Sequence, residues 1–456
     1  MTDRIDRPNI LLIMDDQHRF DYLGAAGASF VNTPNLDRLA ARGTLFTQCA
    51  SNAPVCAPAR IGLASGQQPF RFGSLENTTF LPRSVTTYYQ RLRDHGCRVG
   101  CVGKLDLAKP ERYNGLRGDR PCTFGWGFTH PEECEGKMHA AVSDTPIGPY
   151  TQYLHERGLL ETFVDDYRRR RENGWVKDSR DSALPTDAFE DSYVGRRAAR
   201  WIETVPDDFP WHLFVSFVGP HDPFDPPAEY AERYRSATMP PPIEPHPEGK
   251  PDSYSKKQRG LEPEEVAVTR RQYCAEIELI DRQVGEILDA LERRGMAGNT
   301  VVIVTSDHGE MLGDHGLYTK SLAYEASMRV PLIVAGPGLP QGKTSDALVE
   351  LIDVNPTICD LAGLPPQENI DARSLRPVLD GETGAHREDQ LAVLRTFLCV
   401  RTRTHKLIRN VNDRVELYDL EADPHETTNL ADSEPEIVQR MGRRLHDRVC
   451  EGQWRR

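Results

Sequence analysis

A short motif, Cys56-x-Pro58-x-Arg60, combines residue types that could carry out chemistry on an anion. It stands directly before a helical pattern at residues 61–67, so the cysteine is expected at a helix N-terminus. Unpaired backbone N–H groups at such a position favour negative charge, which suits a reactive thiolate or a bound anion. Arg60 lies one turn further on and carries a fork of donors that matches a tetrahedral oxyanion. The motif alone is equally compatible with a structural cysteine, so its context decides.

Two polar pairs follow apolar runs elsewhere in the chain. Asp15 and Asp16 follow the run at residues 8–14, and Asp307 and His308 stand just beyond residues 301–305. Carboxylate oxygens suit calcium or magnesium, and the imidazole nitrogen would also tolerate manganese or zinc. Each pair taken alone could instead stabilise a turn. Four such residues beside an anion-binding Cys-Arg pair predict a site for one divalent metal ion.

Two further apolar runs, at residues 98–102 and 213–218, also end in polar residues. Lys104 follows the first run, and His221 follows the second within a Pro-His-Asp-Pro turn that would fix the imidazole. Taken alone, each could be an ordinary strand-end residue, and Lys320 could be a surface residue of its Gly-rich loop. The carboxyl ends of parallel strands, however, converge on one crevice in an open α/β sheet. We therefore expect a single site at that edge.

The order of the elements predicts an α/β fold, with a large, mainly parallel sheet sandwiched by helices. The clearest helical pattern runs over residues 264–294. Residues 110–185 and 237–260 are turn-rich or Pro-rich and are predicted to pass over the sheet edge as pocket-shaping loops. Beyond about residue 375, four short strands and a last helix predict a smaller antiparallel sheet. We expect a catalytic domain over residues 1–375 and a small α+β subdomain over residues 376–456.

Composition narrows the possible partners. The 456 residues carry a formal charge of −13, which argues against binding to a nucleic-acid backbone, and no apolar run is long enough to cross a membrane. The apolar stretch at residues 10–14 is too short for the core of a signal peptide, so a cytoplasmic protein is expected. Ten cysteines without CxxC pairs predict neither a zinc knuckle nor a disulfide scaffold. A homo-oligomer is compatible with the sequence, which contains no pattern that decides the matter.

These motifs occur in a fixed order that resembles the type I, formylglycine-dependent sulfatases of the alkaline phosphatase superfamily. The similarity spans nearly the whole chain, from NILLIMDDQ and TPNLDRLAARGTLFTQCASNAPVCAPAR through VGKLDLAKP and SFVGPHDPFDPP to TSDHGEMLGDHGLYTKSLAYEASMRVPLIV and LYDLEADPHETTNLA. It implies an alkaline-phosphatase-like fold and hydrolysis of a small-molecule sulfate ester to an alcohol and inorganic sulfate. It also implies that a separate formylglycine-generating enzyme oxidises Cys56 to formylglycine. One hydroxyl of the hydrated aldehyde would attack sulfur, and deprotonation of the other would expel sulfate.

The resemblance also assigns roles to individual residues. The metal ligands would be an oxygen of the modified Cys56 together with Asp15, Asp16, Asp307 and His308. Arg60 would steady the nucleophile, while Lys104, His221 and Lys320 would contact the sulfate oxygens. Either His221 or Lys320 could protonate the leaving oxygen.

Two residues depart from the family pattern. Asp106 stands where many relatives carry a histidine, so it could accept a proton or bind a cationic or hydroxyl group of the substrate. The oxygen ligands favour calcium as the metal, whereas His308, which stands where many relatives carry asparagine, also makes manganese compatible. Histidine at this position is also compatible with a phosphonate monoester or phosphodiester hydrolase of the same superfamily.

Two functions of a different kind are also compatible with the sequence. The chain could be a homologue that binds a metal and an anion without catalysis, if Cys56 remains a thiol. A Cys-His-Asn type hydrolase would leave the aspartate pairs without a purpose. The sequence does not identify the substrate. Four residues of the first predicted loop are candidates for the pocket, although buried packing is favoured for them, namely Trp126, His130, His139 and Trp175.

Overall fold

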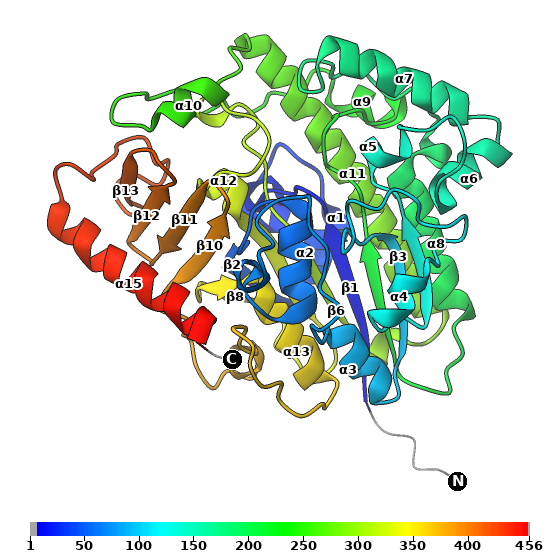
Figure 1. Ribbon diagram of the computed structural model, residues 1–456. Helices are drawn as coiled ribbons and strands as arrows, with labels where there is room; N and C mark the ends of the chain where they lie inside the picture. Colours follow the sequence, from blue (N-terminus) through cyan, green and yellow to red (C-terminus); the bar gives the residue numbers. More distant parts are fainter. Residues whose placement is uncertain (1–6, 455–456) are drawn as a thin grey trace.

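The computed structural model describes residues 7–454, which form a nine-stranded sheet and a separate four-stranded sheet (Figure 1). The order of the large sheet is β4-β3-β5-β1-β6-β7-β2-β8, and β9 also pairs with β2. Its strands are β1 (Asn9–Asp15), β2 (Gly43–Ala50), β3 (Arg98–Lys104), β4 (His130–Cys134), β5 (Trp211–Ser216), β6 (Thr300–Ser306), β7 (Arg329–Ala335), β8 (Lys343–Ser345) and β9 (Val349–Glu350). The four strands predicted from apolar runs, β1, β3, β5 and β6, lie side by side and are parallel. Their polar ends therefore meet at one edge.

Helices cover both faces of the large sheet, as predicted. One apolar layer joins the sheet to α2 (Cys56–Ser65), α3 (Tyr88–Asp94) and α13 (Val354–Leu361). The other layer joins it to α1 (Pro34–Ala41), α6 (Pro149–Glu156), α7 (Leu160–Asn173), α8 (Glu190–Thr204) and α11 (Pro263–Arg293). Because both faces are covered, every residue of β1, β5 and β6 is buried, which explains their continuous apolar runs.

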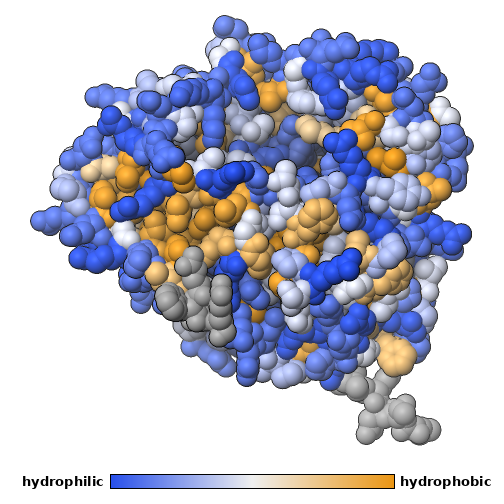
Figure 2. Space-filling view, viewed as in Figure 1, coloured by the Kyte–Doolittle hydropathy of each residue, from blue (hydrophilic) through white to orange (hydrophobic). Residues whose placement is uncertain are grey.

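A small antiparallel sheet follows near the C-terminus, again as predicted. It consists of β10 (Gln390–Leu394), β11 (Phe397–Arg401), β12 (His405–Asn410) and β13 (Val415–Asp419), with α15 (Pro435–Trp454) packed against it. The predicted fold class is thereby confirmed. The boundary between residues 375 and 376 stays a prediction. Hydrophobic residues gather on the face of the molecule over this sheet and α2 (Figure 2).

One prediction was wrong, because residues 110–185 are not mainly loops. They contain the edge strand β4, the helices α6 and α7, and the short helices α4 (Pro121–Gly125) and α5 (Lys137–Ala140). Short helices are marginal by themselves and depend on tertiary packing, so their polar sequences carry little signal. Residues 237–260 do lack regular structure apart from α10 (Asp252–Lys257). The remaining α-helices are α9 (Ala228–Tyr234), α12 (Glu325–Met328) and α14 (Arg376–Leu379).

No helix within residues 7–454 combines the length and the apolar character needed to cross a membrane. The first six residues of the N-terminal segment lie outside the described part of the chain.

The tight pairing of β3 with β5 at Gly103 yields a prediction. Gly103 has φ = 104°, and a Cβ atom there would lie 1.9 Å from the carbonyl oxygen of Ser216. We expect Gly103→Ala to lower the free energy of unfolding by at least about 2 kcal/mol, because both the backbone angle and the strand spacing must change. Denaturant unfolding measures this. The matched control is Gly125→Ala, since a Cβ at Gly125 meets nothing within 4 Å. Equal stabilities of the two variants would contradict the prediction.

Candidate active site

Cys56 is the first residue of α2, so the helix begins five residues earlier than its sequence pattern indicated. Pro58 is tolerated there because the first four N–H groups of a helix have no partner within the helix. Val55 precedes the helix without a side-chain cap, and the Ala57 N–H donates to Asn77 Oδ1 at 3.0 Å. Every residue of α2 is buried. The cysteine is therefore held rigidly at the positive end of a helix.

The Arg60 guanidinium joins the ends of four parallel strands. It donates to Asp16 Oδ2 at 3.1 Å, just beyond β1, and to Asp307 Oδ2 at 2.8 Å, just beyond β6. It also donates to the Lys104 carbonyl oxygen at the end of β3 and to Ser216 Oγ at the end of β5, each at 2.7 Å. The side chain is 1% exposed. Arg60 thus fixes the relative positions of the strand ends that surround Cys56.

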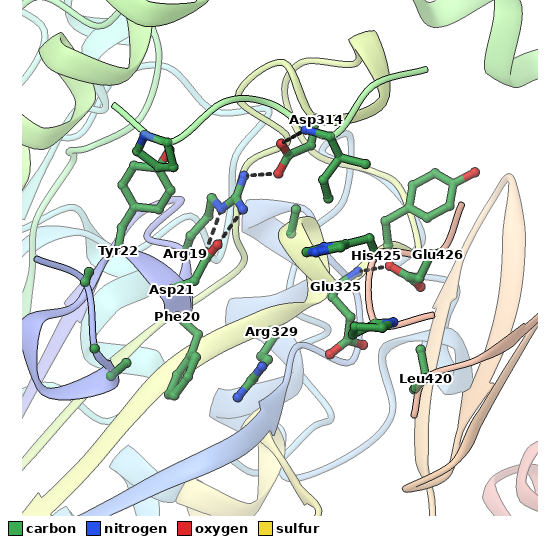
Figure 3. A pocket seen from close by; sticks show the side chains of 18 of the residues that line it. Arg19, Phe20, Asp21, Tyr22, Asp314, Glu325, Arg329, Leu420, His425 and Glu426 are labelled. Carbon is green, nitrogen blue, oxygen red and sulfur yellow. Dashed lines mark hydrogen bonds and ion pairs between the residues drawn. The ribbon is translucent and has the colours of Figure 1, made fainter. Parts of the chain in front are cut away.

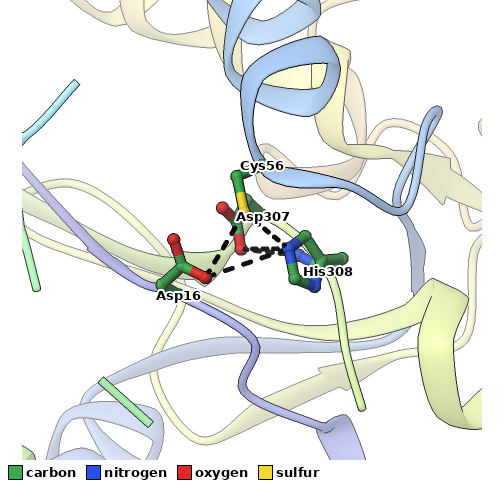
Figure 4. A group of neighbouring side chains, drawn as sticks. All are labelled: Asp16, Cys56, Asp307 and His308. Carbon is green, nitrogen blue, oxygen red and sulfur yellow. Dashed lines mark hydrogen bonds and ion pairs between the residues drawn. The ribbon is translucent and has the colours of Figure 1, made fainter. Parts of the chain in front are cut away.

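Four candidate metal ligands come together beside this guanidinium (Figure 4). One donor atom from each of Asp16, Cys56, Asp307 and His308 lies within 4.8 Å of the others, and all four residues are buried. Cys56 Sγ is 3.3 Å from His308 Nε2 and 3.7 Å from Asp16 Oδ1. His308 Nε2 is 3.6 Å from Asp307 Oδ1. Two carboxylates and one imidazole around a common centre suit a divalent cation.

The His308 ring is oriented for this role. Its Nδ1 lies 2.9 Å from the Gly309 carbonyl oxygen, which can only accept, so Nδ1 carries the proton. In the neutral ring, Nε2 then presents its lone pair on the side that faces Cys56 and the two carboxylates. Metal-binding histidines are commonly held in this way through the second ring nitrogen.

Asp15 lies outside this group of four. Its Oδ2 is 2.6 Å from His18 Nδ1, and His18 Nε2 is 3.1 Å from the carbonyl oxygen of Tyr22. The side chains of consecutive residues at a strand end point to opposite sides of the sheet. Asp15 therefore contacts His18, whereas Asp16 contacts Cys56. Asp15 Oδ1 is nevertheless buried and has no hydrogen-bond partner among residues 7–454. A buried carboxylate oxygen without a donor is costly, which fits a nearby cation.

Lysine side chains surround the thiol. Lys104 Nζ forms ion pairs with Asp16 Oδ2 and, at 3.3 Å, with Asp106 Oδ2. Burial and the Asp16 carboxylate act to raise the pKa of the Cys56 thiol. The charges of Lys104, Lys109 and Lys320 more than offset them and hold that pKa well below its usual value. The site is therefore built to stabilise negative charge at position 56.

Asp106 binds two of the chain's own lysines. Its carboxylate pairs with both Lys104 and Lys109, and although burial opposes it, these charges hold the pKa of Asp106 well below its usual range. A cationic group of a substrate would compete with both. The arrangement favours a role for Asp106 in holding the lysines in place over direct recognition of a cation.

His221 and Lys320 form a pair at the same edge. Lys320 Nζ contacts His221 Nε2 and Gln17 Oε1, and it lies 3.5 Å from Asp222 Oδ1. Both side chains are mostly buried, with exposed fractions of 13% for His221 and 11% for Lys320. The structure thus brings two of the three predicted sulfate-binding residues, His221 and Lys320, into contact.

A buried lysine supports the loop that carries His221. Lys137 Nζ donates to the carbonyl oxygens of His221 at 3.0 Å and Pro223 at 3.2 Å. Its charge is balanced by Glu276 Oε1 at 2.8 Å and Asp225 Oδ1 at 3.2 Å. This lysine is 2% exposed, so it fixes the backbone of the loop without reaching the substrate.

Unusual backbone angles accompany the site. Gln17 (φ 77°), Asp106 (φ 56°), Thr319 (φ 66°) and Ser321 (φ 68°) have positive φ values, which non-glycine residues rarely adopt. Gln17 follows Asp16, and Thr319 and Ser321 stand on either side of Lys320. Asp106 pairs with Lys104 and Lys109. Such strain persists only where the surroundings impose it, and it concentrates at functional sites.

The four aromatic or imidazole candidates of residues 110–185 lie in different places. Trp126 is buried in the core, Trp175 packs against Tyr167, and His130 begins β4 at the opposite edge of the sheet. Only His139 lies near the site, where burial and the Lys109 charge lower its pKa to about 4.

Several residues that line the site had not been predicted, among them Gln17, Lys109 and Ser216. Ser216 ends β5, so its place at a strand end could have signalled it. Gln17 adjoins the aspartate pair. Lys109 follows the strand by five residues and carries no pattern of its own.

Comparisons with known proteins agree with this geometry. The model of the Sulfatase family matches residues 8–364, and that of the N-sulphoglucosamine sulphohydrolase C-terminal region matches residues 313–453. The chain is 30% identical over 452 residues to a choline-sulfatase of Rhizobium meliloti, covering 94% of this chain and 83% of the relative. It is 28% identical over 450 residues to an arylsulfatase of Clostridium perfringens, covering 94% of this chain and 91% of the relative.

A solved structure of the phosphonate monoester hydrolase of Agrobacterium radiobacter superposes with a TM-score of 0.83 at 25% identity, covering 98% of this chain and 96% of that one. The fold, the gathering of the predicted residues at one sheet edge and the match over most of the chain lead to one assignment. The chain belongs to the sulfatase family of the alkaline phosphatase superfamily and is a sulfuric ester hydrolase.

Proposed function

We propose that the protein hydrolyses a small-molecule sulfate ester with a formylglycine derived from Cys56 and one divalent metal ion, with calcium favoured over manganese. The observation that carries this proposal is the position of Cys56 Sγ, 3.3 Å from His308 Nε2 and 3.7 Å from Asp16 Oδ1 at a helix N-terminus. A plain thiol activated by an imidazole has no use for the two carboxylates beside it. A nucleophilic oxygen activated by a cation does.

The hydrated formylglycine would supply a hydroxyl nucleophile. The cation, when bound, would activate this hydroxyl and neutralise negative charge. Asp15, Asp16, Asp307 and His308 would hold the cation, together with an oxygen at position 56. Arg60 keeps Asp16 and Asp307 at a fixed spacing through its hydrogen bonds to both.

The remaining residues act on the substrate. The charges of Lys104 and Lys320 both act on Cys56 by lowering the pKa of its thiol, and these two side chains would bind the sulfate oxygens. His221 Nε2 contacts Lys320 Nζ, so a proton held between them can pass to the leaving alcohol oxygen. The Lys137 contacts hold the His221 loop in the position that this transfer requires.

A cleft that is partly lined by Ser321, the residue after Lys320, would receive the alcohol part of the substrate. It has a volume of about 310 Å³ and is lined by Tyr254, Leu322, Phe397 and Ile408, among others. Leu322 is two residues from Lys320, and the Ser321 N–H donates to the Pro54 carbonyl oxygen at 2.9 Å. The proposed subdomain over residues 376–456 thus contributes one wall, and an apolar or aromatic alcohol fits. Cytoplasmic location, oligomeric state and the transient encounter with a formylglycine-generating enzyme stay predictions.

The modification is tested by mass spectrometry of the peptide that contains Cys56. We expect the aldehyde or its hydrate when the protein is produced with a formylglycine-generating enzyme, and we expect sulfate release from an aryl sulfate. Cys56→Ala should lower kcat/KM by about 10⁴-fold or more, because it removes the nucleophile. Cys101→Ala, a change of another buried cysteine, is the matched control. An unmodified thiol in the native host would favour the non-catalytic alternative.

Metal content provides a second test. We expect about one divalent ion per chain by elemental analysis, with activity lost on chelation and restored by calcium or manganese. Asp16→Asn and Asp15→Asn should both lower metal content, since each removes a charged donor. Asp208→Asn alters a surface pair with Arg98 and should leave metal content unchanged. Full metal content in Asp15→Asn would remove Asp15 from the proposed ligands.

A phosphonate monoester or phosphodiester hydrolase is the second candidate, favoured by the similarity to the Agrobacterium enzyme and by His308. We expect kcat/KM for an aryl sulfate to exceed that for phenyl phosphonate and a phosphate diester. Lys104 and Lys320 supply two cations for the sulfate oxygens. A preference for either phosphorus ester by several orders of magnitude would reverse the assignment.

A further inference from the structure

A second cavity lies along the same edge of the large sheet but is lined by other residues. Its volume is about 620 Å³, within the range of small-molecule sites, and none of the ten predicted site residues lines it. Residues 19–30 form one side of the cavity, and the start of β7, the end of β11 and residues 420–426 form the other (Figure 3). The cavity therefore sits where the large sheet meets the C-terminal sheet.

The upper acidic group of the cavity in Figure 3 is already neutralised. Asp314 pairs with Arg19 at 2.8 Å and with Arg270 at 2.7 Å, and it also accepts the Ile243 N–H at 2.9 Å. Asp21 is bound by the same Arg19 through two hydrogen bonds. Neither carboxylate is left to bind a cation.

The acidic groups of the opposite wall are neutralised as well. Glu325 accepts from Arg401 at 2.8 Å and pairs with Lys406 at 2.7 Å. Glu426 pairs with the same lysine at 2.6 Å and accepts the Glu325 N–H at 2.7 Å. All four carboxylates that line the cavity thus have cationic partners within the protein.

Two nitrogen-containing side chains of the cavity, those of Arg329 and His315, have no carboxylate partner among the residues that the structure describes. Arg329 donates one bond, from Nε to the Thr47 carbonyl oxygen at 2.7 Å, and forms no ion pair with any carboxylate of residues 7–454. Its guanidinium lies 4.1 Å from the centre of the Phe20 ring. His315 is 1% exposed, and its Nδ1 has no partner in the described part of the chain. The unused hydrogen-bonding capacity of the cavity therefore includes a guanidinium fork and a buried imidazole.

Apolar surface completes the cavity. Phe20, Tyr22 and Phe30 line one side, and Tyr324 stacks on the His315 ring with centroids 4.9 Å apart. A cation would meet the unpaired guanidinium of Arg329 and find no free carboxylate. A compact organic anion would place its acidic group on Arg329 and its body against the rings.

We propose that this cavity is a second binding site, separate from the sulfate-ester site, for a small organic anion with a carboxylate or similar group on an apolar or aromatic body. Arg329 is the recognition residue. The proposal does not depend on the formylglycine chemistry.

Titration calorimetry with benzoate tests the proposal, with benzamide as the neutral probe of the same shape. We expect benzoate to bind the full-length protein and benzamide to bind at least about tenfold more weakly, which corresponds to about 1.4 kcal/mol. Arg329→Met should weaken benzoate binding by about tenfold or more. Arg282→Met, which changes an exposed arginine paired with Glu286 outside the cavity, should leave it unchanged.

Two further measurements keep the result unambiguous. Arg329→Lys keeps the positive charge but loses the paired donors of the guanidinium, so it should bind benzoate with intermediate affinity. This variant replaces Arg329→Met in the test if the methionine variant does not fold. Inhibition of aryl sulfate hydrolysis shows whether benzoate occupies the catalytic site instead. Undetectable binding, unchanged affinity in Arg329→Met, or competitive inhibition with a constant equal to the calorimetric Kd would each overturn the proposal.

Discussion

The buried guanidinium of Arg60 is the interaction on which the catalytic edge depends. Four parallel strands end beside it, and its four hydrogen bonds reach one group at the end of each strand. Without it, the buried Asp307 would lose its guanidinium partner, and Asp16 would lose the same partner while keeping its ion pair with Lys104. Breaking such a buried pair typically costs about 3–5 kcal/mol. The same residue therefore stabilises the sheet edge and sets the spacing of the proposed ligands.

Charge balance at this edge explains how so many ionisable groups can be buried together. Lys104 and Lys109 share the Asp106 carboxylate, while Lys320 lies beside Asp222. Each lysine keeps a carboxylate partner and still contributes its field at Cys56. The lysines are thus held in position before any substrate arrives, which reduces the reorganisation needed when negative charge develops.

Much of this edge could be predicted from the sequence, because apolar runs followed by Asp15-Asp16, Lys104 or Asp307-His308 mark buried parallel strands and their carboxyl ends. The position of Cys56 at a helix N-terminus was predicted and is confirmed. The participation of residues 56–60 in that helix and the separate surroundings of Asp15 could not be predicted. They depend on side-chain direction and on His18, which no spacing rule encodes. The helices of residues 110–185 were missed because their stability comes from contacts with distant segments such as α8. Lys109 was missed because only the folded chain brings it to Asp106.

The buried Lys137, held by Asp225 and Glu276 beneath the His221 loop, restricts how this protein can evolve. A neutral residue at position 137 removes the ammonium partner that Asp225 and Glu276 share, and loss of either acid removes one of the two carboxylates that hold this ammonium beneath the loop. Single substitutions at these three positions are therefore expected to be selected against even where the substrate changes. A change at one of these three positions requires a compensating change at another. Related chains should therefore carry either all three charged residues or a set in which they have changed together.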